Sequence, residues 1–216
     1  GLLTDQGIRV VSFSALNDIE KKQLERYFEQ EIKPLLSTII VGKKQPFPFL
    51  QNREIYAVAV LETRSDKAKI GIIPCASRVF DRLVPVPGRS GYYMLAEELI
   101  LHFLPMVFDK YRVQEKSLIR ITRNADIDAD SIYDEDLNYR EHMEEVVRQR
   151  RKLSPVRLEM TRTLDTGIID RLCRVLELSE NQVFMSQSPL DLSFVFQIQD
   201  TLRTLSLIHI SEPTRR

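Results

Sequence analysis

One stretch of the chain holds the residue types most able to bind an ion or a phosphate group. It reads LIRITRNADIDADS, from residue 118 to residue 131. Two arginines are followed at once by three acids spaced two residues apart: Arg120 and Arg123, then Asp126, Asp128 and Asp130. A metal site, a phosphate site and a plain corner between a strand and a helix would all use such a pattern.

The acids have the D-x-D-x-D spacing that begins many calcium-binding loops. Such a loop also needs Gly at its sixth position and Glu at its twelfth, because the chain must turn sharply and wrap around the ion. Ser131 and Leu137 occupy these positions, so the sequence argues against a metal site. Negative charge complements the positive end of a helix. We therefore expect the acids to begin a helix, with Asn124 and Asp126 turning the chain and capping it.

The two arginines lie in SLIRITR, whose period of two predicts a strand. Arg120 and Arg123 are three residues apart, so their side chains should point to opposite faces of the sheet. One could then face a phosphate group or a partner while the other pairs with an acid. For Arg123 the competing interpretation is a structural salt bridge to a nearby Asp. The basic run RQRRK at residues 148–152 is best explained as a solvated helix end, where cations complement the helix dipole.

No catalytic residue follows from the three histidines. His102 lies in the apolar run ILHFL, which predicts a satisfied or partly buried side chain, and His142 lies on a charged helix without the partners of a catalytic triad. His209 belongs to a tail discussed below. Nucleotide-loop, zincin and paired CxxC motifs do not occur in the sequence. On motifs alone, the sequence names no reaction.

Composition limits the class of protein. The 216 residues include 31 Lys+Arg and 31 Asp+Glu, so the net charge is zero and offers no bulk attraction to nucleic acid or membranes. With 43% hydrophobic residues, the chain suits one large domain or two small ones with a real core. No apolar run reaches the ~18 residues of a membrane helix, and the start lacks a signal-peptide pattern. Cys75 and Cys173 are expected to stay reduced as small core residues of a cytoplasmic protein.

The elements that would position these residues alternate along the chain. A helix should begin after Asn17, capped with Glu20, and end or bend at Pro34. Its expected apolar stripe is Ile19, Leu24, Phe28 and Ile32. Further helices are predicted at 94–108 (buried, interrupted at Pro105), 134–152, 166–178 and within 189–202. Strands are predicted at 8–13, 38–41, 55–62, 68–74, 117–123, 156–160 and 183–187. After the strand at 68–74, the chain should continue as a meander that turns at Pro87-Gly88. This interleaving predicts an α+β fold with a mixed β-sheet and packed helices.

Five segments in this order resemble the polyphosphate kinase family, in its longer, histidine-phosphorylated type. They are YFEQEIKPLL, PFPFL, the apolar helix at 94–108, IRITRNAD with VRLEM, and PLDLSFVFQI. The resemblance runs from about residue 2 to 204 and corresponds to that family's middle domain. It implies an α+β domain, 1–204, nearly complete.

The resemblance also implies a function for a parent enzyme. That enzyme would reversibly transfer the terminal phosphate of ATP to polyphosphate with Mg²⁺, through a histidine that the family carries in C-terminal domains. The three histidines here fall on none of the family's catalytic positions, so this fragment alone should be inactive and bind no cofactor. Its implied partners are the N- and C-terminal domains of the same enzyme, a second subunit and polyphosphate. The implied location is cytoplasmic, with membrane association only through the parent assembly.

Two alternatives stay open. One is a non-catalytic binding or scaffold protein that reuses this domain. The other is a small phosphohistidine-handling enzyme, which would need an active-site histidine in a loop or strand. Residues 205–216, LSLIHISEPTRR, resemble a translated sequencing adapter, so we expect a non-native tail rather than a genuine short end and exclude it from fold reasoning.

Overall fold

The computed structural model describes residues 8–64, 68–75, 78–124 and 154–198. Within them a six-stranded sheet has the order β2-β4-β3-β7-β8-β9, and a three-stranded sheet has the order β1-β6-β5. The strands are β1 (Arg9–Val10), β2 (Ile39–Val41), β3 (Ile55–Glu62), β4 (Lys69–Pro74), β5 (Leu83–Pro85), β6 (Tyr92–Leu95), β7 (Arg112–Arg123), β8 (Pro155–Met160) and β9 (Val183–Met185). Both sheets mix parallel and antiparallel pairs, which confirms the predicted α+β fold.

The large sheet is built around the hairpin that the sequence predicts. β3 and β4 pair antiparallel with Val58 opposite Ile72, and β3 also pairs antiparallel with β7. Seven of the eight residues of β3 are buried, because helices cover both faces of the sheet at this point. The last pair, β8 with β9, is parallel.

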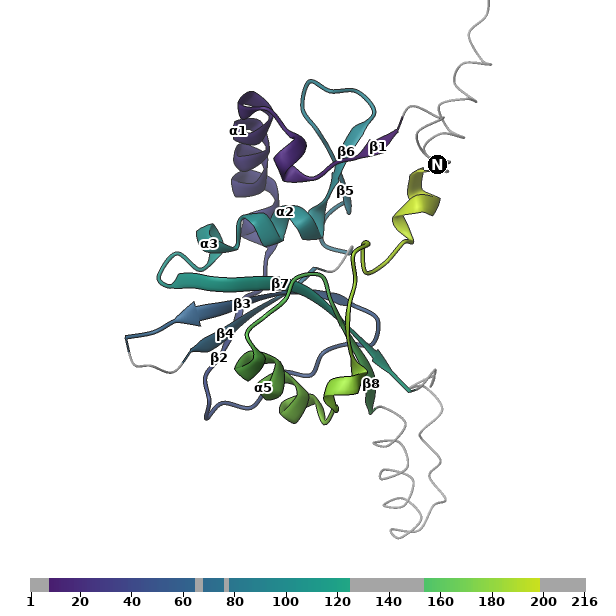
Figure 1. Cartoon of the computed structure of the whole chain (residues 1–216). Coiled ribbons are helices and arrows are strands. Elements are labelled where there is room, and N and C mark those ends of the chain that lie inside the picture. The colour runs from purple at the N-terminus through teal and green to yellow at the C-terminus, as the bar shows by residue number, and fades with distance from the viewer. Residues whose placement is uncertain (1–7, 65–67, 76–77, 125–153, 199–216) are drawn as a thin grey trace, which may run out of the picture.

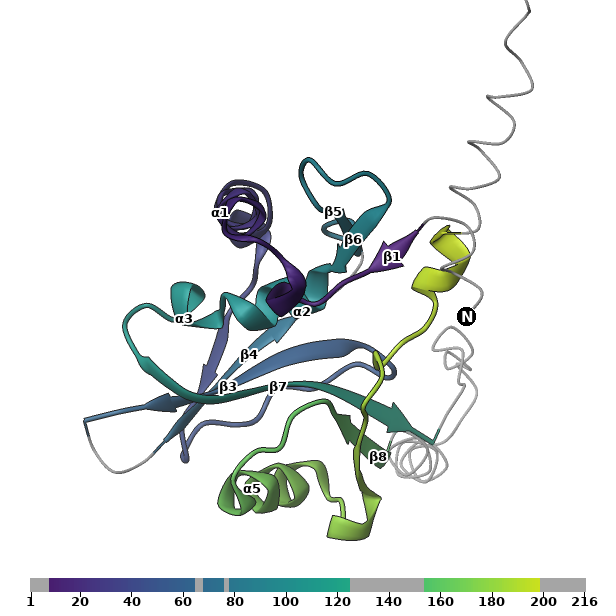
Figure 2. The same ribbon diagram turned by 45° about the horizontal axis from the view of Figure 1, so that its top comes forward.

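Helices form layers on the two faces of this sheet (Figures 1 and 2). On one face lie α1 (Asp18–Tyr27), α2 (Ala96–His102) and α3 (Leu104–Val107), and their core includes Leu24, Phe28 and Leu99. On the other face lies α5 (Thr166–Leu176), whose buried residues pack with those of β7 and β8. Among the described residues, no helix is long and apolar enough to cross a membrane.

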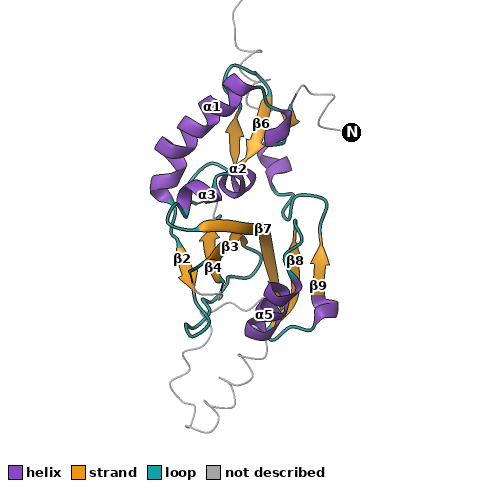
Figure 3. Ribbon diagram, turned by 60° about the vertical axis from the view of Figure 1, so that its left-hand side comes forward, coloured by secondary structure: helices purple, strands orange, loops and turns teal. Residues whose placement is uncertain are grey.

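The small sheet lies beside α1 and on the far side of α2 from the large sheet, as Figure 3 shows. β5 and β6 form the hairpin predicted at Pro87-Gly88, where Gly88 has a φ of +73° that favours glycine. The expectation of one continuing meander is wrong, because β6 pairs with β1 and neither β5 nor β6 joins the large sheet. Residues 194–198 are helical and place Phe194 and Ile198 against this sheet.

Helix α1 confirms the predicted capping box. The Asn17 side chain accepts the Glu20 backbone N–H, and the Glu20 carboxylate accepts the Asn17 N–H, both at 2.9 Å. The helix continues as a π-helical turn (Phe28–Ile32) and a 3-10 turn (Lys33–Leu35), and the chain becomes extended at Leu36 after Pro34. Ile19 was wrongly assigned to the apolar stripe, because its side chain is 70% exposed.

The remaining predicted elements agree with the structure to within a few residues. The apolar helix is interrupted as expected, with Pro105 in the first turn of α3. Strand β7 begins at Arg112, five residues earlier than predicted, and the predicted strand at 8–13 divides into β1 and a 3-10 turn (Phe13–Ala15). The polar helix predicted at 134–152, with the acids Asp126, Asp128 and Asp130 and the RQRRK run, lies outside the described residues.

Candidate functional site

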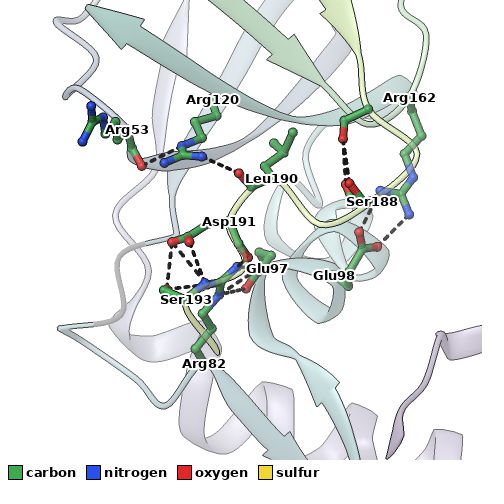
Figure 4. A network of polar contacts seen from close by, with 11 residues as sticks. Arg53, Arg82, Glu97, Glu98, Arg120, Arg162, Ser188, Leu190, Asp191 and Ser193 are labelled. Carbon is green, nitrogen blue, oxygen red and sulfur yellow. Dashed lines mark hydrogen bonds and ion pairs between the residues drawn. The ribbon is translucent and has the colours of Figure 1, made fainter. Parts of the chain in front are cut away.

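The described residues gather their strongest polar contacts around one segment, residues 186–198, which we call the C-terminal strap. It leaves β9 at the edge of the large sheet and ends against the small sheet. Figure 1 shows it as the yellow-green trace beside the two sheets, and Figure 4 shows the side chains that hold it. Arginines from two different elements contact it.

Arg82 and Glu97 form a buried ion pair beside the strap. The Arg82 Nη2 lies 2.6 Å from Glu97 Oε1, and its Nε lies 3.0 Å and 3.2 Å from the two carboxylate oxygens. Their side chains are only 7% and 5% exposed. Two charges are stable at such burial when each satisfies the hydrogen-bonding capacity of the other.

The outer edge of the Arg82 guanidinium binds the strap. Its Nη2 donates to the Asp191 carbonyl at 2.7 Å, and its Nη1 donates to Ser193 Oγ at 3.1 Å and lies 3.3 Å from Asp191 Oδ2. Burial by itself would raise the pKa of Asp191. Hydrogen bonds from Ser193 and the charge of Arg82 outweigh burial and lower the pKa.

The two predicted arginines do point to opposite faces. Arg120 donates from Nε to the Arg53 carbonyl at 3.1 Å and from Nη1 to the Leu190 carbonyl, on the face of α2. On the face of α5, Arg123 donates from Nε and Nη2 to the Leu50 carbonyl at 3.0 Å and 2.8 Å. Its guanidinium also lies 4.1 Å from the centre of the Phe49 ring. Each arginine thus binds backbone that connects other elements.

Burial lowers the pKa of the Arg123 guanidinium, although the neighbouring Tyr56 opposes this shift. At neutral pH an arginine stays charged in any case. Asn124 follows at the end of β7, where its backbone N–H donates to the Ser154 carbonyl at 3.1 Å. Asp126 lies outside the described residues, so the predicted helix cap and the predicted salt bridge to a nearby acid stay predictions.

A pocket of about 220 Å³ opens beside the strap. Its charged lining consists of Arg53, Glu54, Arg78, Arg82 and Asp191. The signs alternate: Arg78 lies 3.7 Å from Glu54, and Arg82 is paired with Glu97 and Asp191. With Glu97 included, the three arginines lie beside three acids, so this pocket has no strong excess of positive potential for an anion.

No described group has the arrangement of a nucleophile with its base. Cys75 and Cys173 are free thiols, as expected, and burial raises the pKa of both. His102 lies at the surface, where one side of its ring stacks on Phe13 at 3.6 Å, which agrees with the expectation of a satisfied or partly buried side chain. Burial of part of the ring and the charge of Lys116 lower its pKa. His142 and His209 lie outside the described residues.

Sequence reasoning missed Arg82, Glu97 and Asp191. Arg82 lies 15 residues from Glu97 and 109 from Asp191, and no local pattern joins residues so far apart. Only one signal was available: Asp191 precedes Ser193 and an apolar helical run, as in many helix caps. The structure confirms this turn, with the Ser193 N–H donating to Asp191 Oδ1 at 2.8 Å.

Comparisons with known proteins agree with one another. A family model described as the polyphosphate kinase middle domain matches residues 19–198. The chain is 34% identical to the polyphosphate kinase of Halalkalibacterium halodurans over 205 residues, 93% of this chain and 29% of the relative. It is 31% identical to that of Mycolicibacterium paratuberculosis over 208 residues, 92% of this chain and 28% of the relative.

A solved structure shows the same fold. The crystal structure of polyphosphate kinase from Porphyromonas gingivalis superposes with a TM-score of 0.63 at 19% identity, covering 88% of this chain and 27% of that chain. The chain therefore spans less than a third of the length of the relatives it matches.

Proposed function

The chain belongs to the polyphosphate kinase family, and we propose that it is the middle domain, residues 1–204, of an enzyme that reversibly transfers the terminal phosphate of ATP to polyphosphate. The observation that carries this proposal is the match of the middle-domain family model to residues 19–198. In the parent enzyme the phosphate would pass through a histidine outside this domain. The domain itself would be architectural: it would place the neighbouring regions and support association of subunits.

The described residues do not offer a site for the metal that this chemistry needs. Among residues 8–64, 68–75, 78–124 and 154–198, no three His, Cys, Asp or Glu side chains come together as metal ligands. We propose that ATP and Mg²⁺ bind to other regions of the parent, where the family carries its catalytic histidine. We also propose that the parent is a cytoplasmic homo-oligomer.

Several large apolar side chains support the architectural role, because they are exposed in this chain and would be covered by neighbouring regions. They are Phe49, Val175, Phe184, Met185, Leu192 and Phe196, each at least 41% exposed. Phe184 and Met185 lie on β9, at the edge of the large sheet, and Leu192 and Phe196 lie on the strap. Nothing in the fold or the comparisons favours the alternative of a free-standing scaffold protein.

A domain exchange tests the proposal. Residues 19–198 would replace the matching segment of the Halalkalibacterium halodurans enzyme, and polyphosphate synthesis from ATP would be measured for the chimera, the intact relative and this chain alone. We expect synthesis by the chimera and none by the chain alone. Synthesis by the chain alone would refute the architectural role. A folded chimera that orders its catalytic regions but makes no polymer would refute the family assignment of function.

The same chimera tests the prediction that Arg120 or Arg123 contacts phosphate. Each would be changed to Ala, and both the melting temperature and polyphosphate synthesis would be measured. The hydrogen bonds described above give either change a cost in stability. A fall in synthesis at a temperature where the variant is still fully folded would support phosphate contact. An equal loss of stability and activity would leave only the structural role.

A further inference from the structure

The C-terminal strap is fastened to both sheets at two consecutive residues. The Leu190 carbonyl accepts a hydrogen bond from Arg120, which belongs to β7 of the large sheet. The next carbonyl, that of Asp191, accepts one from Arg82, which directly precedes β5 of the small sheet. Two arginines from separate sheets thus bind successive peptide groups (Figure 4).

We propose that Arg82 is a positioning residue that fixes the path of the chain from residue 190 to residue 198. Glu97 holds its guanidinium from the inner side, and the carbonyl, carboxylate and hydroxyl groups of the strap occupy its outer side. Arg120 holds the strap at Leu190, and Arg82 sets its direction from Asp191 onward to the small sheet. When these contacts are lost, the strap should release while the two sheets stay folded.

The chemistry of arginine explains why this position holds it. A guanidinium carries five N–H donors in a fixed plane, so it can bind a carboxylate on one edge and further acceptors on another. A lysine ammonium has its three donors at one point and cannot serve both sides of the contact. Glu97 also offsets the charge, which allows Arg82 to stay 93% buried.

The helical part of the strap depends on contacts with the rest of the domain. This part spans only residues 194–198, and a helix this short is unstable on its own. Phe194 and Ile198 are buried against the small sheet, but Leu192 and Phe196 are 57% and 68% exposed. Of the six large apolar side chains of the strap, Leu190, Phe194 and Ile198 are buried and Val195 is partly buried, so apolar packing and the polar contacts hold it together.

The consequence for the parent enzyme rests on the proposed function. The middle-domain family model ends at residue 198, so the strap is the final part of the matched region. Fixing its direction would fix how the region that follows is presented to this domain. The strap itself can be tested without any reference to polyphosphate.

Hydrogen exchange of the whole chain gives that test. The reporters are the amides of Val195 and Phe196, which donate to the Leu192 and Ser193 carbonyls. In Arg82→Lys we expect these amides to exchange roughly ten- to hundredfold faster, while those of β3 and β4 keep their rates, because the hydrogen bonds of Arg82 join Glu97 to the strap and involve neither strand. The matched control is Arg162→Lys, because Arg162 binds Glu98, the neighbour of Glu97 on α2, at 2.6 Å and lies on the surface.

A second variant keeps the test decisive if Arg82→Lys does not fold. The double change Asp191→Asn with Ser193→Ala leaves the Arg82–Glu97 pair intact and keeps a side-chain oxygen that can accept the Ser193 N–H, while it removes the charge and the hydroxyl that the strap presents to Arg82. Selective acceleration at the strap in this variant supports the proposal. Unchanged exchange, uniform acceleration in every element, or equal acceleration in Arg162→Lys would each overturn it and leave the enzyme assignment untouched.

Discussion

Gly71 packs directly against the Phe108 ring that follows α3, and we predict that Gly71→Ala destabilises the fold. Gly71 lies in β4, between Ile40 of β2 and Ala59 of β3. A Cβ atom at this position would lie 2.6 Å from Cζ and 2.9 Å from Cε2 of Phe108. Carbon atoms prefer a separation of about 3.5–4.0 Å. The Phe108 ring would have to retreat by about 1 Å, although it is 97% buried in a packed core.

The size of the effect follows from two opposing contributions. Overpacking of this kind costs about 1–3 kcal/mol. Replacing a strand glycine by alanine returns about 0.5–1 kcal/mol through lower freedom of the unfolded chain. We therefore expect a net loss of about 1–2 kcal/mol, which for a domain of this size lowers the melting temperature by about 2–8 °C. Urea and thermal unfolding of the two chains would measure it.

A double-mutant cycle shows whether Phe108 is the cause. In a Phe108→Leu background the side chain beside residue 71 is shorter, so Gly71→Ala should become neutral or slightly stabilising. The difference between the two backgrounds should then be about 1–3 kcal/mol. If Gly71→Ala destabilises both backgrounds equally, the close approach of Phe108 is not the reason, and the packing of α3 against β4 has been misjudged.

Three further predictions concern buried charges and thiols. Arg82→Met should lower the free energy of unfolding by about 3–5 kcal/mol, because it leaves the buried Glu97 charge without a partner. Urea unfolding should show a smaller loss of stability when Glu97→Leu is added. Burial alone would raise the pKa of Asp191, but hydrogen bonds from Ser193 and the charge of Arg82 lower it. The ionised Asp191 therefore stabilises the fold fully above the unfolded pKa of about 3.9, and this stabilisation is lost as the pH falls through the lower folded pKa. Strap exchange should accelerate over this acidic range in the natural chain, whereas Asp191→Asn should be nearly independent of pH there. Burial raises the pKa of the Cys75 and Cys173 thiols. A thiol reagent at pH 8 should therefore react with both thiols in urea but only slowly in the native chain. Fast reaction of the native chain would contradict this.

Features that depend on neighbours in sequence were predicted well. The capping box of Asn17 and Glu20 needs residues three apart, and the turn at Gly88 needs one glycine. The error at Ile19 shows the limit of this reasoning. Leu24 lies five residues later, which on a helix is a rotation of about 140° away from the same face. Ile19 therefore faces solvent, while Leu24 and Phe28 face the core.

Features that depend on distant segments could not be predicted from the sequence alone. The hairpin of β5 and β6 was visible, but its partner β1 comes from the other end of the chain, about 80 residues earlier. The stacking of His102 on Phe13 likewise joins segments far apart in the sequence, and no local pattern indicated it. Arg82 and Asp191 meet only because the strap crosses between the sheets, a path that no local pattern encodes.

The arginines of this domain suggest how a phosphate-handling family can use basic residues without binding phosphate at each. Arg82, Arg120 and Arg123 all direct guanidinium donors at backbone carbonyls of connecting segments: Asp191, Leu190 and Leu50. To bind a phosphate group with those donors, an arginine would first have to give up these hydrogen bonds and leave a buried carbonyl without a donor, which costs about 1–3 kcal/mol. Fastening loops and binding anions therefore compete at the same atoms. In this domain these arginines hold connecting segments in place, and a phosphate contact at Arg120 that leaves the strap attached would have to use donors other than those bound to Arg53 and Leu190.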